Sequence, residues 1–515
     1  MASVAAPRSQ NAISESADAS TESINFDEFT TPPVWEAAGP ISINGGVVEG
    51  ITNRPVSGAL QAIAMHPADP DTLLVGAVNG GIWRTTNARD ASVSWTPTSD
   101  FEASLSISSI AYSPVAPHNV VFAGIGAFSS FGHIAGPAFG LLRSTTGGTA
   151  NSWDHLASGV WRETSVSKVL PLTHLNRNTL LVATTDPKGG STAEGDEDLG
   201  LYVTTNALAA RPDFVRVSAD KGDANPPANL LPFGAVTDVV VDPIDLLPVP
   251  DTDPGTTTVY AAVRQKGVYM ATMTAGSISG GAVFSDWTHL SDGMITGAFP
   301  EDNVGRTLLA AHNSAESGNE VVLYAAVARH SPPEADAPPP AALHNIFRVE
   351  LSGDGPFAWN ELDAPTTTEP GSPPKVVGIH GGGQAERHFS FLAHPTDANT
   401  IYIGGDAQPK VSGFRNDTGC RAFSGRLFVG TGADVSNANW TPITCKFANS
   451  TSPHADSRGM IFDDNGTTDV SDDTVIQIDD GGIYRLNNPA TKFSETSEGA
   501  TETRNTHWVS YRHGP

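Results

Sequence analysis

Residues 62–87 read AIAMHPADPDTLLVGAVNGGIWRTTN, and Trp95 follows eight residues later. An apolar run ends in a His-Pro turn, a second apolar run follows, and a Gly-Gly-Ile-Trp-Arg unit precedes the tryptophan. The same order of features occurs seven times along the 515 residues. Self-similarity at intervals of some tens of residues indicates a repeat architecture.

The Gly-Ile-Trp-Arg unit marks the repeats, which follow one another at intervals of roughly 56 to 81 residues. Its further copies are Gly140–Arg143, Gly200–Val203, Gly267–Met270, Asn345–Arg348, Arg426–Val429 and Gly482–Arg485. A short β-branched run such as Leu73–Val75 precedes each copy, and an aromatic residue such as Trp153 follows most of them. Apolar runs of this length, bounded by Gly, Pro, Asn and Asp, predict strands. Seven units of about four strands predict an all-β, seven-bladed β-propeller with four-stranded antiparallel blades.

The repeats leave the first part of the chain uncovered. Residues 1–33 are rich in Ser, Ala, Thr and acids and predict a disordered leader, whereas 34–515 are expected to form the propeller. Trp35 and Trp508 both resemble the aromatic residue of an outer strand, yet a ring of seven blades needs only one of them. Either Trp35 closes the ring, or Trp508 does.

The composition excludes several classes of partner. The formal charge is −27, from 56 acidic and 29 basic residues, which disfavours binding to nucleic acid and to anionic membranes. No segment is long and apolar enough to predict membrane insertion, and the N-terminal residues lack a signal-peptide pattern. We therefore expect a soluble acidic protein; secretion would need a route without a signal peptide. The sequence does not indicate an oligomeric state.

The anchor units and the tryptophans that follow them resemble the BNR, or Asp-box, repeat. That box reads Ser-x-Asp-x-Gly-x-x-Trp in sialidases, xyloglucanase-type glycoside hydrolases and sortilin-type receptors, and here it is degenerate, as in Thr85–Asn87 before Trp95. The resemblance covers about 34–511 and is strongest to an uncharacterised subgroup of such propellers. Members of that subgroup continue past the last residue here, so a longer repeat array is a further expectation. Because propellers of this kind include enzymes, receptors and assembly factors, the resemblance specifies the fold more closely than the activity.

One turn carries the sharpest functional hypothesis. Asp480-Gly481-Gly482-Ile483-Tyr484-Arg485 resembles the turn that supplies a catalytic carboxylate in xyloglucanase-type propellers. A glycosidase needs a second carboxyl group within roughly 5–10 Å, and Asp456 or Asp406 is the candidate partner. In the family, however, the catalytic turn lies in the first blade, where this chain has Asn79, and an amide cannot transfer the proton. The structural alternative is that Asp480 caps its own turn by accepting backbone hydrogen bonds.

The loops at one end of the blades predict a ligand-binding face. In a four-stranded meander, the loop entering the inner strand and the loop joining the second and third strands lie at the same end. Polar residues in these loops, which we expect to contact a ligand, are Arg54, Asn79, His380, Arg387, His388, His454 and Arg458. The three arginines could form a carboxylate-binding cluster of the sialidase kind, although the sialidase Arg-Ile-Pro signature is absent.

Metal and disulfide sites remain open alternatives. No cofactor is required by any motif, but His454 and Asp456, with Asp479 or Asp480, could hold a divalent ion such as calcium. The acidic run Glu194–Asp198 is a second possible calcium site, and a solvated acidic loop is its simpler interpretation. Cys420 and Cys445 both fall in the sixth repeat and are either disulfide-bonded or free buried thiols.

The sequence therefore favours a non-catalytic or weakly catalytic propeller that recognises a glycan or protein ligand on its channel face. The alternative is a glycoside hydrolase, sialidase-like or xyloglucanase-like, that uses paired aspartates as acid and as base or nucleophile.

Overall fold

The computed structural model describes residues 43–126, 136–138, 140–156, 160–161, 164–173, 179–186, 196–246, 256–274, 284–291, 294, 301–313, 320–330, 341–352, 355, 357–411, 415–432, 438–465, 472–489 and 506–511. All of them belong to one compact unit, Ile41–Pro515. The expected leader and Trp35 lie outside these residues. None of the helices in the described part is long and apolar enough to cross a bilayer.

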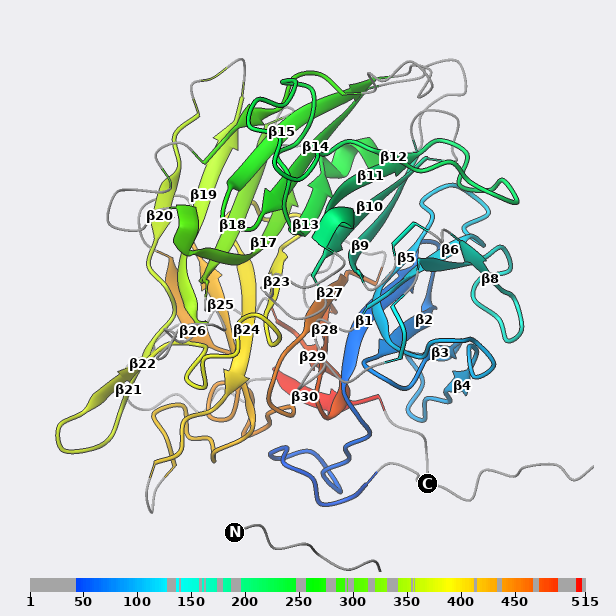
Figure 1. Ribbon diagram of the computed structural model, residues 1–515. Coiled ribbons are helices and arrows are strands. Elements are labelled where there is room, and N and C mark those ends of the chain that lie inside the picture. Colours follow the sequence, from blue (N-terminus) through cyan, green and yellow to red (C-terminus); the bar gives the residue numbers. More distant parts are fainter. Residues whose placement is uncertain are drawn as a thin grey trace, which may run out of the picture. The chain divides into compact units, whose positions relative to one another are not determined.

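Seven four-stranded antiparallel sheets form the described unit, and in each the strands are paired in chain order. The predicted seven-bladed propeller is thus confirmed, and Figure 1 shows the blades following one another from blue to red. The innermost strands are β1 (Leu60–His66), β5 (Ile107–Tyr112), β9 (Ser165–Leu172), β13 (Val236–Val241), β17 (Val304–His312), β23 (Ser390–Ala393) and β27 (Gly459–Asp463). Each contacts the innermost strand of the next blade, and β27 contacts β1, so the ring is closed.

The other strands occupy equivalent places in each blade. The second strands are β2 (Asp69–Ala77), β6 (Val121–Ile125), β10 (Thr179–Thr185), β14 (Thr256–Val263), β18 (Val321–Arg329), β24 (Ile401–Ala407) and β28 (Thr474–Asp479). The third strands, which hold the repeated anchors, are β3 (Ile82–Thr85), β7 (Leu141–Ser144), β11 (Gly200–Thr204), β15 (Gly267–Thr274), β19 (Leu343–Leu351), β25 (Gly425–Thr431) and β29 (Gly482–Asn487). The outer strands are β4 (Thr96–Pro97), β8 (Trp153–Leu156), β12 (Val215–Arg216), β16 (Thr288–His289), β20 (Asn360–Leu362), β26 (Asn439–Pro442) and β30 (His507–Ser510).

The remaining elements are short. A hairpin of β21 (Thr367–Glu369) and β22 (Lys375–Val377) stands between blades five and six. Three 3₁₀ turns complete the described elements: η3 (Asp196–Asp198), η4 (Pro243–Leu246) and η6 (Glu301–Asn303). Two residues of the possible calcium run, Glu194 and Gly195, lie outside the described residues. The Asp198 carbonyl accepts hydrogen bonds from Thr184 and Tyr202, so η3 braces blade three.

The hydrophobic core lies between blades. Each of the seven apolar clusters in the described part of the chain joins two neighbouring blades, as face-to-face sheets require. The second strands are therefore buried on both faces; all seven residues of β10, for example, are buried. This explains why these strands read as continuous apolar runs instead of alternating ones. The cluster that contains Leu73 and Ile476 packs blade one against blade seven and so closes the ring.

Tryptophans in the outer strands, or directly before them, bond five of the seven blades to the blade before. The indole N–H groups of Trp153, Trp359 and Trp508 donate to Thr98 Oγ1, the Leu290 carbonyl and the Ile443 carbonyl at 3.3, 2.6 and 2.7 Å. Trp440 donates likewise to the Asp363 carbonyl, and Trp95 to the Tyr511 carbonyl at 3.1 Å. Every acceptor belongs to the first residue after the outer strand of the preceding blade. We call these five contacts the indole bonds.

The indole bonds also settle which tryptophan completes the last blade. Trp508 lies in β30, the outer strand of blade seven, and is 1% exposed. All four strands of that blade come from the C-terminal part of the described chain. The segment 43–57 packs beside it, with a bridge between Glu49 and Ser452 and the Ser57 N–H bonded to the Gly481 carbonyl at 2.7 Å.

Candidate functional site

The loop 380–388, which enters blade six, lies among residues of several blades. On one side Glu386 accepts a hydrogen bond from Arg264 of blade four at 2.8 Å, and the same guanidinium reaches Asp186 of blade three at 2.9 Å. On the other side His388 meets residues of blade seven. All three members of the Asp186–Arg264–Glu386 network have side chains no more than 12% exposed. The loop is thereby fixed by buried charges from both sides of the ring.

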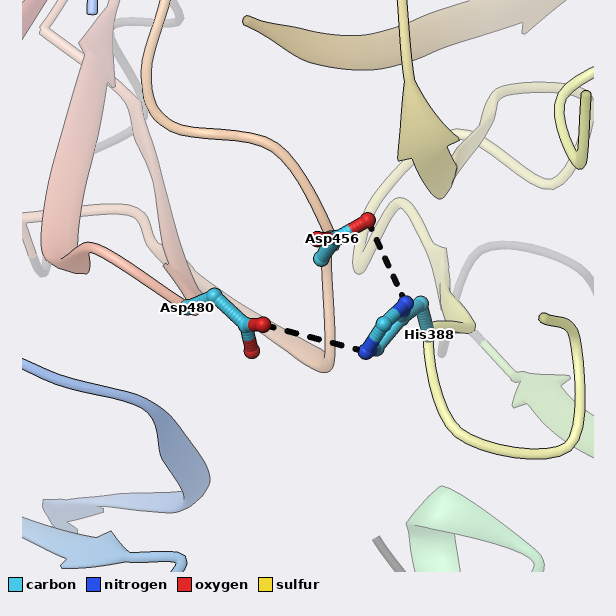
Figure 2. A group of neighbouring side chains, drawn as sticks. All are labelled: His388, Asp456 and Asp480. Atoms are coloured by element: carbon cyan, nitrogen blue, oxygen red, sulfur yellow. Dashed lines mark ion pairs between the residues drawn. The ribbon is translucent and has the colours of Figure 1, made fainter. Parts of the chain in front are cut away.

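His388 is the centre of the candidate site (Figure 2). Its Nδ1 lies 3.2 Å from Asp456 Oδ1 and 3.9 Å from Asp406 Oδ1, and its Nε2 lies 3.9 Å from Asp480 Oδ2. The His388 side chain is 5% exposed, whereas those of Asp456 and Asp480 are 21% and 29% exposed. The ring therefore lies between two carboxylates that both reach the solvent.

Arg458, directly before β27, joins this cluster to blade one. Its Nε donates to Asp480 Oδ1 at 2.6 Å, its Nη1 to Gln61 Oε1 at 3.2 Å, and its Nη2 lies 3.2 Å from His388 Nε2. As expected, the loop that enters the inner strand and the loop that joins the second and third strands lie at the same end of the blade. This placement explains the Arg458–Asp480 contact. The close approach of these loops needs a glycine, since a Cβ at Gly481 would lie 2.4 Å from His454 Cβ.

The turn of blade seven is capped by a different aspartate from the one we expected. Asp479 Oδ1 accepts the Gly481 N–H at 2.8 Å, whereas Asp480 bonds to Arg458. The Asp479 side chain is completely buried, and burial, with the nearby Asp480 and Asp456 carboxylates, raises its pKa well above its usual range. Asp479 is thus engaged in a turn, and the group of possible metal ligands includes its neighbour Asp480 instead.

The two carboxylates beside His388 Nδ1 have opposite pKa shifts. Burial, with the adjacent Asp456 carboxylate, raises the pKa of Asp406 to about 7, although the Gly382 and Gln384 N–H groups bond to Asp406 Oδ2. Burial alone would raise the pKa of Asp456, but His388, together with His454 and Arg458, brings it below its ordinary value. Asp456 is therefore an anion at neutral pH, and Asp406 titrates near neutrality.

Two predicted ligand contacts belong to the framework of the loop. His380 accepts the Leu343 N–H at Nδ1 (3.0 Å), and its Nε2 lies 2.8 Å from the His388 carbonyl. Burial lowers the pKa of His380 to about 3, so the ring is neutral and holds the backbone of His388 in place. The Arg387 carbonyl accepts a bond from Arg306 at 3.2 Å, and burial and the neighbouring Arg458 charge lower the pKa of the half-buried Arg387 guanidinium.

The other predicted contacts lie on separate segments. Arg54 is exposed on the 43–57 segment, where its carbonyl accepts the Gly46 N–H at 2.8 Å. Asn79 is exposed in the β2–β3 turn and accepts a hydrogen bond from Ser106 at 2.8 Å. His454 is half-buried, with Nδ1 3.1 Å from the Ala455 carbonyl. The structure thus brings together five of the predicted residues: His388, Asp406, Asp456, Arg458 and Asp480.

Several members of the network were missing from the prediction. Gln61, Arg264, Asp186 and Glu386 come from four different blades, and none of them was among the predicted site residues. The dense polar sequence of 380–388 was the available signal. The sequence around a residue does not show which residues of distant blades it will contact.

A separate polar cleft of about 390 Å³ opens at the opposite end of blade seven. Arg89, Asp463, Asp473 and His507 are among the residues that line it. Asp463 is 4% exposed and already paired with Arg89 at 2.6 Å, with a second Arg89 contact at 3.3 Å. This carboxylate is neutralised by its neighbour, so the His388 cluster is the stronger candidate for chemistry.

The sequence matches no protein-family model and no curated protein. Among solved structures it is similar to a GH74 xyloglucanase from Xanthomonas campestris, with a TM-score of 0.50 and 15% identity over 92% of this chain and 56% of that enzyme. A GH74 enzyme from Niastella koreensis gives a TM-score of 0.47 and 14% identity over 91% of this chain and 55% of that one. The BP39L lectin from Burkholderia pseudomallei gives a TM-score of 0.41 and 13% identity over 85% of this chain and 98% of the lectin. The chain thus spans little more than half the length of the two GH74 enzymes, and at these identities the likeness concerns the fold.

The disulfide alternative is resolved in favour of a bond. Cys420 and Cys445 form a disulfide with a Cα–Cα distance of 5.4 Å, between segments that flank β25 and β26. The bond lies in blade six, the blade whose entry loop carries His388.

Proposed function

We propose that this protein is a recognition propeller that binds a hydroxyl-rich glycan over the His388 cluster without hydrolysing it. The partly exposed Asp456 and Asp480 carboxylates offer hydrogen-bond acceptors, and the half-buried Arg387 guanidinium offers donors, within one end of the ring. Adjacent acceptors and donors of this kind suit the vicinal hydroxyl groups of a sugar. The fold that the chain shares with a xyloglucanase supports the class of ligand only as an analogy.

One observation favours binding over hydrolysis: neither exposed carboxylate is arranged as a proton donor. Asp480 is held in an ion pair with Arg458 at 2.6 Å, and the pKa of Asp456 lies below its ordinary value. Asp406 has the raised pKa that a general acid needs, but its side chain is 2% exposed and one of its oxygens accepts two backbone bonds. A glycosidic oxygen cannot reach a carboxyl group that is buried in this way.

A retaining glycoside hydrolase is the second candidate, supported by a different distance. Ligand atoms of Asp456 and Asp480 lie within 4.8 Å of each other, close to the carboxyl spacing of about 5–5.5 Å that retaining enzymes use. In that mechanism Asp480 and Asp456 would divide the acid/base and nucleophile roles. Glycan binding would then be followed by turnover.

Glycan arrays and glycosidase substrates, tested with the full chain and with Asp480→Asn, separate the two candidates. We expect saturable binding without turnover, weakened at least about tenfold in Asp480→Asn. Asp154→Asn is the matched control, because Asp154 also pairs with an arginine at 3.1 Å but is 66% exposed and belongs to β8. Turnover that is lost in Asp480→Asn would establish the hydrolase instead, and a wild-type chain that neither binds nor cleaves any glycan would overturn both.

A further inference from the structure

Three buried side-chain atoms that lack a well-aligned hydrogen bond lie on the Nδ1 side of His388. They are His388 Nδ1, Asp456 Oδ1 and Asp406 Oδ1. Nδ1 lies 3.2 Å from the first oxygen and 3.9 Å from the second, and the His388 and Asp406 side chains are 5% and 2% exposed. His388 Nδ1 and Asp456 Oδ1 pair with each other, whereas the buried Asp406 Oδ1 has no partner among the described residues. A buried polar atom without a partner costs about 1–3 kcal/mol, so this oxygen indicates that a further group satisfies it.

An imidazole nitrogen and two carboxylate oxygens are a ligand set for a divalent transition-metal ion. Two ligands bound at about 2.1 Å around a tetrahedral or octahedral ion are about 3.0–3.4 Å apart, which matches the separation of His388 Nδ1 from Asp456 Oδ1. The Asp406 oxygen, at 3.9 Å from Nδ1, has to move closer to bind the same ion. We propose that His388 Nδ1, Asp456 Oδ1 and Asp406 Oδ1 bind one divalent cation of the Zn²⁺ or Mn²⁺ type.

The surrounding contacts hold the three ligands in place. Gly382 and Gln384 N–H groups bond to Asp406 Oδ2 at 2.8 and 3.3 Å, which directs Oδ1 toward His388. His380 holds the His388 carbonyl at 2.8 Å. Asp456 has a φ of +71°, a left-handed conformation that is costly for a residue with a Cβ and is often found at functional sites. Outer contacts of this kind orient metal ligands in proteins.

The Nε2 side of the ring accommodates the cation by a change of tautomer. Without the ion, Nε2 can accept from Arg458 Nη2 at 3.2 Å while Nδ1 carries the proton. With the ion on Nδ1, the imidazole proton moves to Nε2, where it faces Asp480 Oδ2. The Arg458 Nη2 group then moves away from Nε2, while Arg458 Nε keeps its bond to Asp480 Oδ1. The imidazole keeps one proton in both forms. The Asp456 and Asp480 carboxylates and the Asp406 carboxyl group surround the ring, and the Arg458 guanidinium contacts it from the Nε2 side.

Calorimetric titration of the metal-free full chain with ZnCl₂ and MnCl₂ tests the site without any glycan, so its outcome is separate from that of the proposed function. We expect one equivalent of Zn²⁺ or Mn²⁺ to bind, with affinity reduced at least about tenfold in His388→Gln and in Asp406→Asn. His454→Gln is the matched control, because His454 lies beside the cluster but contributes none of the three atoms; its affinity should stay within about threefold. Absence of saturable binding, or equal affinity in all variants, would overturn the site.

X-ray absorption of the Zn²⁺-loaded wild type keeps the test valid if a variant fails to fold. The expected spectrum has nitrogen and oxygen neighbours at about 2.0–2.1 Å, with the outer scattering of one imidazole. Two or more imidazoles would place the metal elsewhere and contradict the proposal.

Discussion

At the scale of single residues, the loop 380–388 contains two histidines with opposite roles. His388 faces three carboxylates, whereas both ring nitrogens of His380 are used by backbone groups of Leu343 and His388. His380 therefore acts as a fixed hydrogen-bonding bracket. Its neutral form is part of the folded structure, so acid should weaken the fold through this residue.

The pH dependence of stability tests this role. The pKa of His380 is about 3 in the folded chain against 6.5 as the ordinary value, so between these values the unfolded chain binds a proton that the folded chain does not. Stability should fall as the pH decreases through this range. In His380→Gln the acceptor and donor remain but the titration is lost, so the stability gap between wild type and variant should change by about 2 kcal/mol from pH 7 to pH 5. Urea unfolding at several pH values measures it; parallel curves would contradict the assignment.

At the scale of elements, the loop 380–388 depends on a buried ion pair that spans blades. Glu386→Gln weakens the bond to Arg264 and should destabilise the fold by about 2 kcal/mol, with faster amide hydrogen exchange in the loop. Glu350→Gln is the matched control, because Glu350 also pairs with an arginine at 2.7 Å but is 54% exposed. We expect it to cost less than about 1 kcal/mol. Equal losses in denaturant unfolding would show that burial of the Glu386 pair is unimportant.

The disulfide of blade six is a second element-scale test. Replacing Cys420 and Cys445 together by serine releases a cross-link with a sequence separation of 25, which should cost about 3 kcal/mol. A reductant should lower the thermal unfolding temperature of the wild type and leave that of the double variant unchanged. Equal temperatures for oxidised and reduced wild type would contradict this prediction.

Strands could be predicted from the sequence where residues close together in the chain determine them. The apolar runs that became β2 and β18 sit within short stretches bounded by turn residues, so their strand character was visible. The β21–β22 hairpin was missed, because its fixed position depends on Arg426, whose guanidinium bonds to Thr367 and to the Val377 and Gly378 carbonyls from another strand. The same limit applies to the site. Asp456 and Asp480 were predictable from one repeat, but their contact with His388 exists only once the ring has closed.

At the scale of the whole molecule, the ring is held by apolar layers between blades and by the indole bonds. Trp95→Phe removes the bond to the Tyr511 carbonyl, which joins blade one to blade seven, and should cost about 1 kcal/mol beyond the change in packing. Trp287→Phe is the matched control, because the half-buried Trp287 lies at the same place in blade four and its Nε1 has no hydrogen-bond partner.

Denaturant unfolding and hydrogen exchange of the two variants measure this difference. Trp95→Phe should speed exchange in β30, whereas Trp287→Phe should leave β30 unchanged. Identical behaviour would mean that the indole bond adds nothing to ring closure.

The direction of the indole bonds also determines the order in which these bonds can form during synthesis of the chain. In blades two, five, six and seven, the indole N–H reaches back to a residue made earlier, so each bond can form as soon as its own blade leaves the ribosome. Trp95 is the reverse case, since its acceptor lies 416 residues further along the chain. The bond between blade one and blade seven is thus the last of the five to form, and the face of blade one that meets blade seven stays uncovered until then. Protection of that face by a chaperone would matter most for this blade.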